Sequence, residues 1–419
     1  MNEISARDAL ILERSLRLFK YLFLNDPQPP FKLILTPTDR CNLNCIFCPN
    51  FVGRKNQRYR PEDEISDEEW LRVVEEGVKM GVRQWCILGG GEPLLRRELI
   101  LPILEKIKNG FKVIDLEIIT NGTLLTEEII NGLIKTCKEK VDKAGHEHAA
   151  IQITTSLHGL GKTYQEITGF DLSENVIKNI SLITSLREKA KLSNPIIQIN
   201  IVVNKKNLNE IKDLILKLSN IKVNQIALHA LHIYEETKEI VEKILPTPQE
   251  YKSLLSDVEE LIPKIKNSRV DVISLTSYLQ QLDSTFKDKI DEKIKTSLKK
   301  EENKYKKYAF FNYRCYEPWY SMLINPDGRV GRCASFVTRE EPINVKNESL
   351  REIWFGDFMN GVRENVKKNI IMKGCDPCAL QSNTIVLRRE LKNFVDSYIK
   401  NDINKIKEIE SFLKEWSSK

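Results

Sequence analysis

The feature that most limits the fold of this chain is an alternation of two hydrophobic periods between about residues 32 and 231. Short apolar runs are separated by longer stretches with the spacing of amphipathic helices. This alternation predicts repeated βα units and a parallel sheet. We therefore predict an α/β fold, a partial (β/α)6 TIM-like barrel, whose functional residues lie on loops after the strands. The six apolar runs are FKLILT at 31–36, RQWCILG at 83–89, VIDLEIIT at 113–120, AIQITTSLH at 150–158, PIIQINIVV at 195–203 and VNQIALHAL at 223–231.

The segments that flank the barrel have different patterns. The first residues and the last ones have helical spacing, and the segment after the sixth run is charged with scattered leucines. Further on, an alternating run turns at Pro326-Asp327-Gly328, which predicts a hairpin in a small α+β domain. The predicted units are an N-terminal helix at 1–31, the barrel at 32–234, a helical insertion or linker at 235–310, the small C-terminal domain at 311–380 and a C-terminal helix at 381–419.

Composition limits the class of protein. The 419 residues can bury a sizeable core without disulfides, and the nine cysteines are an odd number. The first residues carry acidic side chains through a helical pattern rather than a secretory signal, and no apolar run is long enough to span a bilayer. We therefore predict a cytoplasmic protein with reduced thiols and no membrane partner. The net charge of +6 comes from 65 basic and 59 acidic residues, so a nucleic-acid partner is not expected.

Three cysteines lie close together in the stretch CNLNCIFC, in the loop after the first predicted strand. Cys41, Cys45 and Cys48 have the spacing C-x3-C-x2-C. They could bind zinc, bind an iron–sulfur cluster, form a disulfide with one thiol left over, or have no ligand. Structural zinc normally takes four ligands, and no histidine or fourth cysteine lies near. A four-iron cluster held by three cysteines leaves one iron open to a small molecule.

This triplet resembles the signature of the radical S-adenosylmethionine (SAM) enzymes. Phe47 also matches the aromatic residue that precedes the third cysteine in that family. The resemblance implies a [4Fe-4S] cluster on the three cysteines, with SAM bound to the open iron. It also implies reductive cleavage of SAM to a 5′-deoxyadenosyl radical, which takes a hydrogen atom from a substrate. A flavodoxin- or ferredoxin-type electron donor is the corresponding partner.

Further matches to the same family follow the second and third predicted strands. Gly90, Gly91, Glu92 and Pro93 in ILGGGEPLL resemble the family's glycine-glycine-glutamate-proline motif. In this interpretation the glycines let the backbone approach the methionine part of SAM, and Glu92 receives its ammonium group. The other residues predicted to bind the cofactor are Thr120 and Asn121 in TNGT, Ser156 at the end of the fourth strand and Asn200 near the end of the fifth.

A second set of cysteines lies near the C-terminus: Cys315, Cys333, Cys375 and Cys378. Two of them flank the predicted hairpin and two form a C-x2-C turn, so four thiolates could hold either zinc or a four-iron cluster. The spacing around Gly328 is similar to the opening of the SPASM auxiliary-cluster domain. A full SPASM domain carries seven cysteines. This chain has four in the corresponding segment, so the segment resembles the shortened twitch form of that domain. The resemblance implies one auxiliary [4Fe-4S] cluster.

These matches lead to one predicted function and to alternatives. We predict an oxidoreductase that dehydrogenates a small-molecule or peptide substrate, with the auxiliary cluster accepting an electron. Glu317, Tyr316 and Arg314 beside Cys315 are the candidates for the proton transfer. The alternatives are radical bond formation or epimerisation on a peptide or sugar precursor, and a non-catalytic metal-binding protein that acts on nucleic acid. Cys86 and Cys137 are expected to be packing residues, although either thiol could donate a hydrogen atom.

Overall fold

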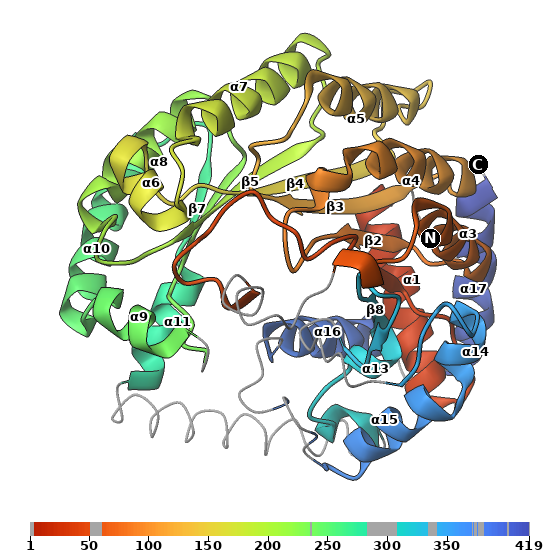
Figure 1. The fold of residues 1–419 in the computed structure, drawn as a ribbon. Helices are drawn as coiled ribbons and strands as arrows, with labels where there is room; N and C mark the ends of the chain where they lie inside the picture. The colour runs from red at the N-terminus through yellow and green to blue at the C-terminus, as the bar shows by residue number, and fades with distance from the viewer. Residues whose placement is uncertain are drawn as a thin grey trace.

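The computed structural model describes most of the chain, and the following account refers to those residues. The described ranges are 4–50, 61–234, 237–282, 308–333, 342–370, residues 372 and 375, 381–399 and 402–418. A curved sheet lies at the centre, and helices cover its outer face (Figure 1). Within the described ranges, none of the helices has the length and apolar character that crossing a bilayer requires.

The sheet confirms the predicted α/β class and the partial barrel. All six predicted strands are present in chain order, and each is hydrogen-bonded in parallel to the next. Their carboxyl ends therefore meet at one edge, where ligand sites form in folds of this type. The strands are β1 (Lys32–Leu35), β2 (Gln84–Ile87), β3 (Ile114–Thr120), β4 (Ala149–Ser156), β5 (Ile196–Val202) and β6 (Gln225–His229).

Three further strands extend this sheet at its two ends. Strand β7 (Arg269–Asp271) pairs in parallel with β6, and β8 (Ser321–Ile324) pairs in parallel with β1. Strand β9 (Val330–Gly331) is antiparallel to β8 and completes the predicted hairpin, in which Gly328 has a φ of +84°. The barrel sheet thus continues into two segments that the sequence assigned to other units. Strand β7 lies in the segment predicted to be helical, because three residues are too few for a periodic signal.

Helices connect the strands and cover the outer face of the sheet (Figure 1). Helix α3 begins after Ser66, whose side chain and that of Glu69 form a reciprocal capping box, as the sequence SDEE predicts. The short helix α6 was not predicted. The connecting helices are α3 (Asp67–Met80), α4 (Arg97–Gly110), α5 (Glu127–Glu139), α6 (Gly161–Thr168), α7 (Ser173–Lys189) and α8 (Ile211–Asn220), followed by α9 (Lys238–Ile244), α10 (Pro248–Leu261) and α11 (Ile273–Leu282).

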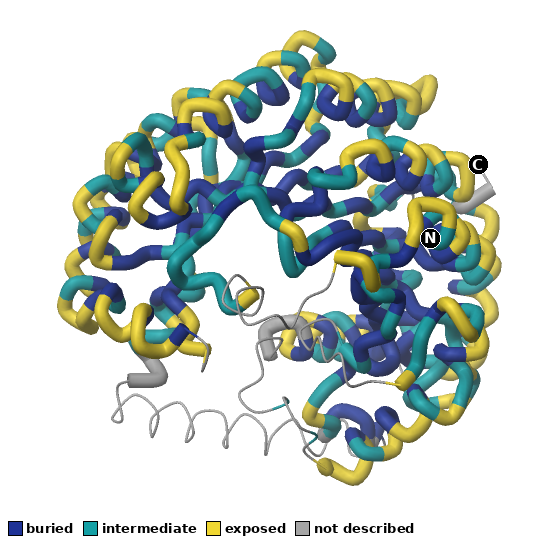
Figure 2. Tube along the Cα trace, in the orientation of Figure 1, coloured by how far each residue is buried: buried dark blue, intermediate teal, exposed yellow. Residues whose placement is uncertain are grey.

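The two faces of the sheet differ in polarity. On β3 and β5 every second residue is fully buried, and these residues, such as Leu116 and Ile199, pack under the helices. The residues between them are partly exposed and face the inside of the barrel (Figure 2). A closed TIM barrel fills its interior with packed side chains, whereas this open sheet keeps an accessible inner face.

Both ends of the chain meet in a second apolar cluster. Helix α1 (Ala6–Phe23) packs against α16 (Gln381–Phe394) and α17 (Lys405–Ser418), and Phe19 contacts the rings of Tyr308, Phe310 and Phe394. The described part of the C-terminal segment contains two helices, with a π-helical turn at Val395–Ile399 directly after the first, rather than the single helix predicted.

Arg363 connects these C-terminal elements. It lies on α15 (Asp357–Lys367) with 2% of its surface exposed, and its guanidinium lies 4.5 Å from the centre of the Trp354 ring. Its Nε donates to the Pro318 carbonyl at 2.9 Å, and its Nη1 donates to the Trp354 carbonyl at 2.8 Å. One side chain therefore joins α13 (Glu317–Tyr320), α14 (Leu350–Phe355) and α15.

We expect Arg363→Ala to lower the free energy of unfolding by about 3 kcal/mol, since it leaves buried carbonyls unpaired and removes a cation–π contact. Urea denaturation of the purified protein measures the change. Arg351→Ala is the control, because Arg351 is exposed and its guanidinium lies 5.1 Å from the centre of the Phe355 ring, so this variant also loses a cation–π contact but leaves no buried carbonyl unpaired. Equal stability of the two variants would contradict this account of Arg363.

Candidate active site

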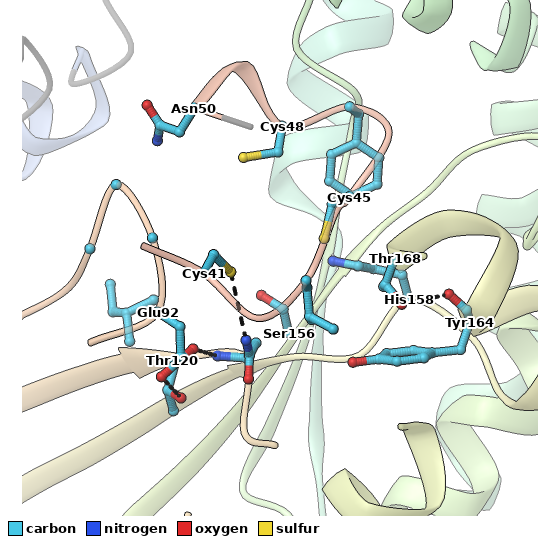
Figure 3. Close-up of a pocket in the computed structure, with 17 residues that line it drawn as sticks. Cys41, Cys45, Cys48, Asn50, Glu92, Thr120, Ser156, His158, Tyr164 and Thr168 are labelled. Atoms are coloured by element: carbon cyan, nitrogen blue, oxygen red, sulfur yellow. Dashed lines mark hydrogen bonds between the residues drawn. The ribbon is translucent and has the colours of Figure 1, made fainter. Parts of the chain in front are cut away.

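A pocket opens at the carboxyl ends of β1 to β4, where the loops of the barrel meet (Figure 3). Its wall contains residues from the cysteine loop, from the glycine-rich loop after β2 and from α6. Most of the residues predicted to bind SAM lie here. The lining residues are Cys41, Leu43, Cys45, Phe47, Cys48, Asn50, Gly89, Gly90, Gly91, Glu92, Ile119, Thr120, Asn121, Ser156, His158, Tyr164 and Thr168.

The cysteine loop places three thiols on one side of this pocket. Cys41, Cys45 and Cys48 are all partly exposed and all line it (Figure 3). The loop is held against α6, because the Asn44 and Ile46 amides donate to the carbonyls of Thr168 and Ile167 at 2.8 and 3.0 Å. Helix α6 is therefore the support that fixes the spacing of the thiols.

The arrangement of the thiols fits a cluster better than a single ion. In the described part of the chain, no three Cys, His, Asp or Glu side chains are grouped closely enough to hold one metal ion. A zinc site needs its ligands within about 2.3 Å of one atom. A four-iron cluster carries each thiolate on a different iron, so it accepts a wider set, and three cysteines leave its fourth iron open. The donor set therefore fits a [4Fe-4S] cluster with a free coordination site.

The glycines after β2 are required by a close contact between loops. A Cβ atom on Gly91 would lie 1.9 Å from the Arg40 carbonyl oxygen, and one on Gly90 would lie 2.0 Å from Asp39 Oδ1. The Glu92 amide donates to the same Arg40 carbonyl at 2.7 Å. These glycines thus let the loop after β2 approach the residues just before Cys41. The same glycines line the pocket, and room for the methionine part of SAM remains a prediction for them.

Glu92 lies below this contact and joins two loops. Its exposed fraction is 1%, and it accepts a hydrogen bond from Thr120 Oγ1 at 2.6 Å (Figure 3). It also accepts from the Asn121 amide at 2.6 Å and from the Leu94 amide at 3.0 Å. Burial raises the pKa of the Glu92 carboxyl, and the three donors oppose that rise. The carboxylate therefore holds the loops after β2 and β3 together, and binding of an ammonium group remains a prediction for it.

Two of the predicted cofactor residues do not line the pocket. Pro93 is the first residue of the short 3-10 helix that follows Glu92, and it is not part of the pocket wall. Asn200 lies two residues before the end of β5, where its Oδ1 accepts from Gln198 Nε2 at 2.8 Å. The sequence could not place Asn200 because strand ends are set by pairing across the sheet. Thr120, Asn121, Ser156 and Phe47 do line the pocket, as predicted.

His158, which ends the fourth predicted strand, is a further pocket residue. Its Nδ1 accepts from the Val202 amide at 3.1 Å, so the proton lies on Nε2, and its ring meets that of Phe47 edge-on at 5.1 Å. Burial lowers the pKa of His158 to about 4, and the nearby His229 adds to this effect. The imidazole is therefore neutral near pH 7. Tyr164 and Thr168 also line the pocket, but the sequence did not predict them as site residues, because they lie on helix α6, which was not predicted.

The described cysteines of the second set lie outside this pocket. Cys315 precedes α13, Cys333 follows β9 and Cys375 lies further along, all partly exposed, whereas Cys378 lies outside the described residues. The Glu317 amide donates to Cys315 Sγ at 3.4 Å. The role of these four cysteines as ligands of the auxiliary cluster remains a prediction.

The three predicted catalytic residues surround Cys315 but do not reach the pocket. Glu317 is 1% exposed and accepts from the Ser321 hydroxyl, and Tyr316 is fully buried and donates to the Phe310 carbonyl at 3.0 Å. Arg314 is exposed. Ser321 pairs with the first residue of β1, at the amino end of the sheet, while the pocket lies at the carboxyl end. Any role of these residues in the reaction therefore depends on the second cysteine set.

Together, the partial barrel and the three-thiol pocket define a protein built to hold a cluster with an open iron at the carboxyl ends of its strands. The radical SAM superfamily matches residues 35–187, and the SPASM iron-sulfur cluster-binding domain matches residues 315–379. The chain therefore contains a radical SAM domain and a C-terminal SPASM domain. These domains imply SAM, the radical SAM cluster and an auxiliary four-iron cluster as cofactors, as predicted.

The curated relatives align with about half of this chain. A probable GTP 3′,8-cyclase from Sulfurisphaera tokodaii is 31% identical over 223 residues, which is 51% of this chain and 63% of the relative. A probable GTP 3′,8-cyclase from Pyrococcus abyssi is 31% identical over 166 residues, 40% of this chain and 47% of the relative. The chain thus spans about half to three-fifths of these relatives.

Solved structures share the fold. Streptococcus suis SuiB bound to S-adenosylmethionine has a TM-score of 0.55 and 20% identity, covering 80% of this chain and 68% of SuiB. The enzyme anSMEcpe with bound AdoMet has a TM-score of 0.51 and 16% identity, covering 90% of this chain and all of that one. At these identities the similarity establishes the architecture alone.

We expect Gly91→Ala to displace the cysteine loop, because its methyl group has no space beside the Arg40 carbonyl. After anaerobic reconstitution the iron content should fall from about eight to about four atoms per chain, with loss of SAM binding. Iron analysis and equilibrium dialysis with SAM measure both. Gly361→Ala is the control, since nothing lies within 4 Å of its Cβ position on α15. Full iron and SAM binding in Gly91→Ala would refute the role of this contact.

Proposed function

We propose that this protein cleaves SAM reductively, uses the radical to remove a hydrogen atom from a substrate, and oxidises that substrate with the help of an auxiliary cluster. The observation that supports this most is the set of three thiols from one loop that line one pocket, with no fourth cysteine among the described residues of its wall. A protein needs such a set when one iron must stay open to a small ligand.

The chain's own residues would supply binding and orientation. Cys41, Cys45 and Cys48 would hold the first cluster, which when reduced and bound to SAM supplies a 5′-deoxyadenosyl radical. Asn121 Nδ2 lies 3.9 Å from Cys41 Sγ, and hydrogen bonds to ligand sulfurs tune a cluster's potential. The neutral His158 offers an Nε2–H donor on the pocket wall. Thr120, Asn121 and Ser156 would add polar contacts to SAM.

Oxidation of the substrate would use the second cysteine set. Cys315, Cys333, Cys375 and Cys378 would hold the auxiliary cluster, and a cluster with four protein ligands suits electron transfer rather than substrate binding. Removing one hydrogen atom, one proton and one electron from the substrate completes a two-electron oxidation. Glu317, Tyr316 and Arg314 would lie beside the auxiliary cluster at the amino end of the sheet, so a proton from a substrate in the pocket would reach Glu317 only through intervening groups.

The proposed partners follow from this scheme. SuiB has been crystallised with the precursor peptide SuiA, which favours a peptide as one possible substrate, and a small molecule is the other. A flavodoxin- or ferredoxin-type protein would deliver the electron, and the reduced clusters suit a cytoplasmic location.

A second candidate function is epimerisation, and Cys86 favours it. This residue lies on the inner face of β2, 2% exposed, with its thiol 3.8 Å from Glu117 Oε2. Burial raises the pKa of the Cys86 thiol to about 12, and Glu117 adds to the rise, so the group stays protonated. A protonated thiol can return a hydrogen atom to a carbon radical. Epimerisation would place solvent deuterium in the product, whereas dehydrogenation would not.

The first test is anaerobic reconstitution with iron and sulfide, followed by an assay for 5′-deoxyadenosine with SAM and dithionite. We expect about eight irons per chain and 5′-deoxyadenosine in the wild type. The triple variant Cys41→Ala, Cys45→Ala, Cys48→Ala should keep about four irons and form no 5′-deoxyadenosine. Cys137→Ala is the control, because Cys137 is buried on α5 outside the pocket. Zinc at both sites and intact SAM would reject the proposal.

The double variant Cys315→Ala, Cys333→Ala tests the auxiliary site. We expect it to lose about four irons while it still forms 5′-deoxyadenosine, because Cys315 and Cys333 lie near the amino end of β8 whereas the pocket lies at the carboxyl ends of the strands. Electron paramagnetic resonance of the reduced protein should show one cluster signal instead of two. A variant that keeps its first cluster but cleaves no SAM would show that the two sites are not independent.

A further inference from the structure

The wall of the pocket contains a buried hydroxyl group that has no hydrogen-bond partner. Tyr164 on α6 is 0% exposed, and its Oη forms no hydrogen bond with any of the described residues. No other described residue of the pocket wall has a buried side-chain nitrogen or oxygen without a partner. Buried hydroxyl groups are almost always paired, because an unpaired one loses its hydration without compensation. A group that binds in the pocket can supply the missing acceptor.

Tyr164 belongs to the helix that supports the cysteine loop. The Asn44 and Ile46 amides, which flank Cys45, donate to carbonyls at the end of α6 at 2.8 and 3.0 Å. The position of Cys45 is thereby fixed relative to the helix that carries Tyr164. Figure 3 shows the Tyr164 ring extending away from α6 below the cysteine loop, with the hydroxyl at the far end of the ring. The ring and the three thiols are parts of the same pocket wall.

The Tyr164 hydroxyl is a hydrogen-bond donor, and two oxygen-bearing side chains of the pocket wall are already engaged. Burial raises the pKa of this hydroxyl, the Cys45 thiol adds to the rise, and Thr168 opposes it. The group therefore stays protonated near pH 7. Thr168 Oγ1 donates to the Tyr164 carbonyl at 2.9 Å, and Glu92 already accepts three hydrogen bonds. Sulfur atoms of an iron–sulfur cluster carry negative charge and can accept such a donor.

We infer that Tyr164 donates a hydrogen bond to a sulfur of the first cluster and thereby raises the reduction potential of that cluster. The inference rests on the cluster that the matched domains imply, and not on the reaction proposed for the substrate. Reduction makes the cluster more negative, and a hydrogen-bond donor stabilises the more negative state. Tyr164 is in this sense a positioning residue that acts through the cluster.

A redox titration of the reconstituted protein without SAM, followed by electron paramagnetic resonance, tests the inference. The signal that the triple variant Cys41→Ala, Cys45→Ala, Cys48→Ala lacks belongs to the first cluster. At the potential where the wild type is half reduced, Tyr164→Phe should have a ratio of reduced to oxidised first cluster that is about tenfold lower. This change corresponds to a midpoint potential that is lower by about 59 mV for one electron.

Tyr251→Phe is the matched control. Tyr251 on α10 is also 0% exposed, lies outside the pocket wall, and donates to the Val203 carbonyl at 3.4 Å. This variant loses a buried tyrosine hydroxyl without changing the pocket. Its first cluster should therefore keep the wild-type ratio of reduced to oxidised form.

Electron–nuclear double resonance of the reduced protein, before and after exchange into D2O, gives a second readout. The Tyr164 hydroxyl should contribute an exchangeable proton that is magnetically coupled to the first cluster. We expect this coupling to be lost in Tyr164→Phe and kept in Tyr251→Phe. A change in packing alone would shift signals but would not remove one coupled proton.

The remaining outcomes count against the inference. An unchanged ratio in Tyr164→Phe would overturn it, and so would a changed ratio with every coupled proton retained. Weaker binding of SAM in equilibrium dialysis, with the SAM-free cluster unchanged, would show that the hydroxyl binds SAM instead. A Tyr164→Phe protein without first-cluster iron would show a role in assembly rather than in the potential.

The same preparations separate this inference from the proposed function. A wild type that forms the first cluster but no 5′-deoxyadenosine would reject the proposed function and leave the hydrogen bond to be measured. A wild type without the first-cluster signal would overturn both.

Discussion

The position of β1 between β2 and β8 is the constraint on which the rest of the structure depends. The strand is hydrogen-bonded on both edges, in parallel, to one strand of the barrel and to one strand from the SPASM segment. Because parallel pairing fixes register, the loop after β1 starts at a set height above the sheet. That loop carries the three cysteines, so the sheet determines where the cluster forms. It also ties the two iron–sulfur regions to one rigid support.

Buried polar groups make the pocket rigid around this loop. Glu92 and His158 are nearly inaccessible, and each is held by backbone amides rather than by solvent. Leaving such a buried polar group without a hydrogen-bond partner would lower the free energy of unfolding by about 1–3 kcal/mol. These groups therefore favour one arrangement of the loops. A preorganised pocket suits a radical reaction, because the reactive group must meet the substrate before it meets anything else.

The comparisons bear on the cofactors rather than on the substrate. The matched domains account for SAM and for the two clusters. Which substrate such a protein accepts is decided by side chains rather than by the fold, because one scaffold can present many substrate surfaces.

The sequence by itself determined the βα order, the six barrel strands, the hairpin and the cysteine sets, because periodicity and ligand spacing are local properties. It also located most of the SAM pocket, since motifs after strands meet at one edge of a parallel sheet. Only the tertiary structure decided that β7 and β8 join the barrel, that Gly91 serves a contact with Arg40, and that Tyr164 faces the pocket. It likewise moved Glu317 and Tyr316 to the opposite end of the sheet from that pocket. These features depend on pairing and packing between residues far apart in the chain, which no local pattern records.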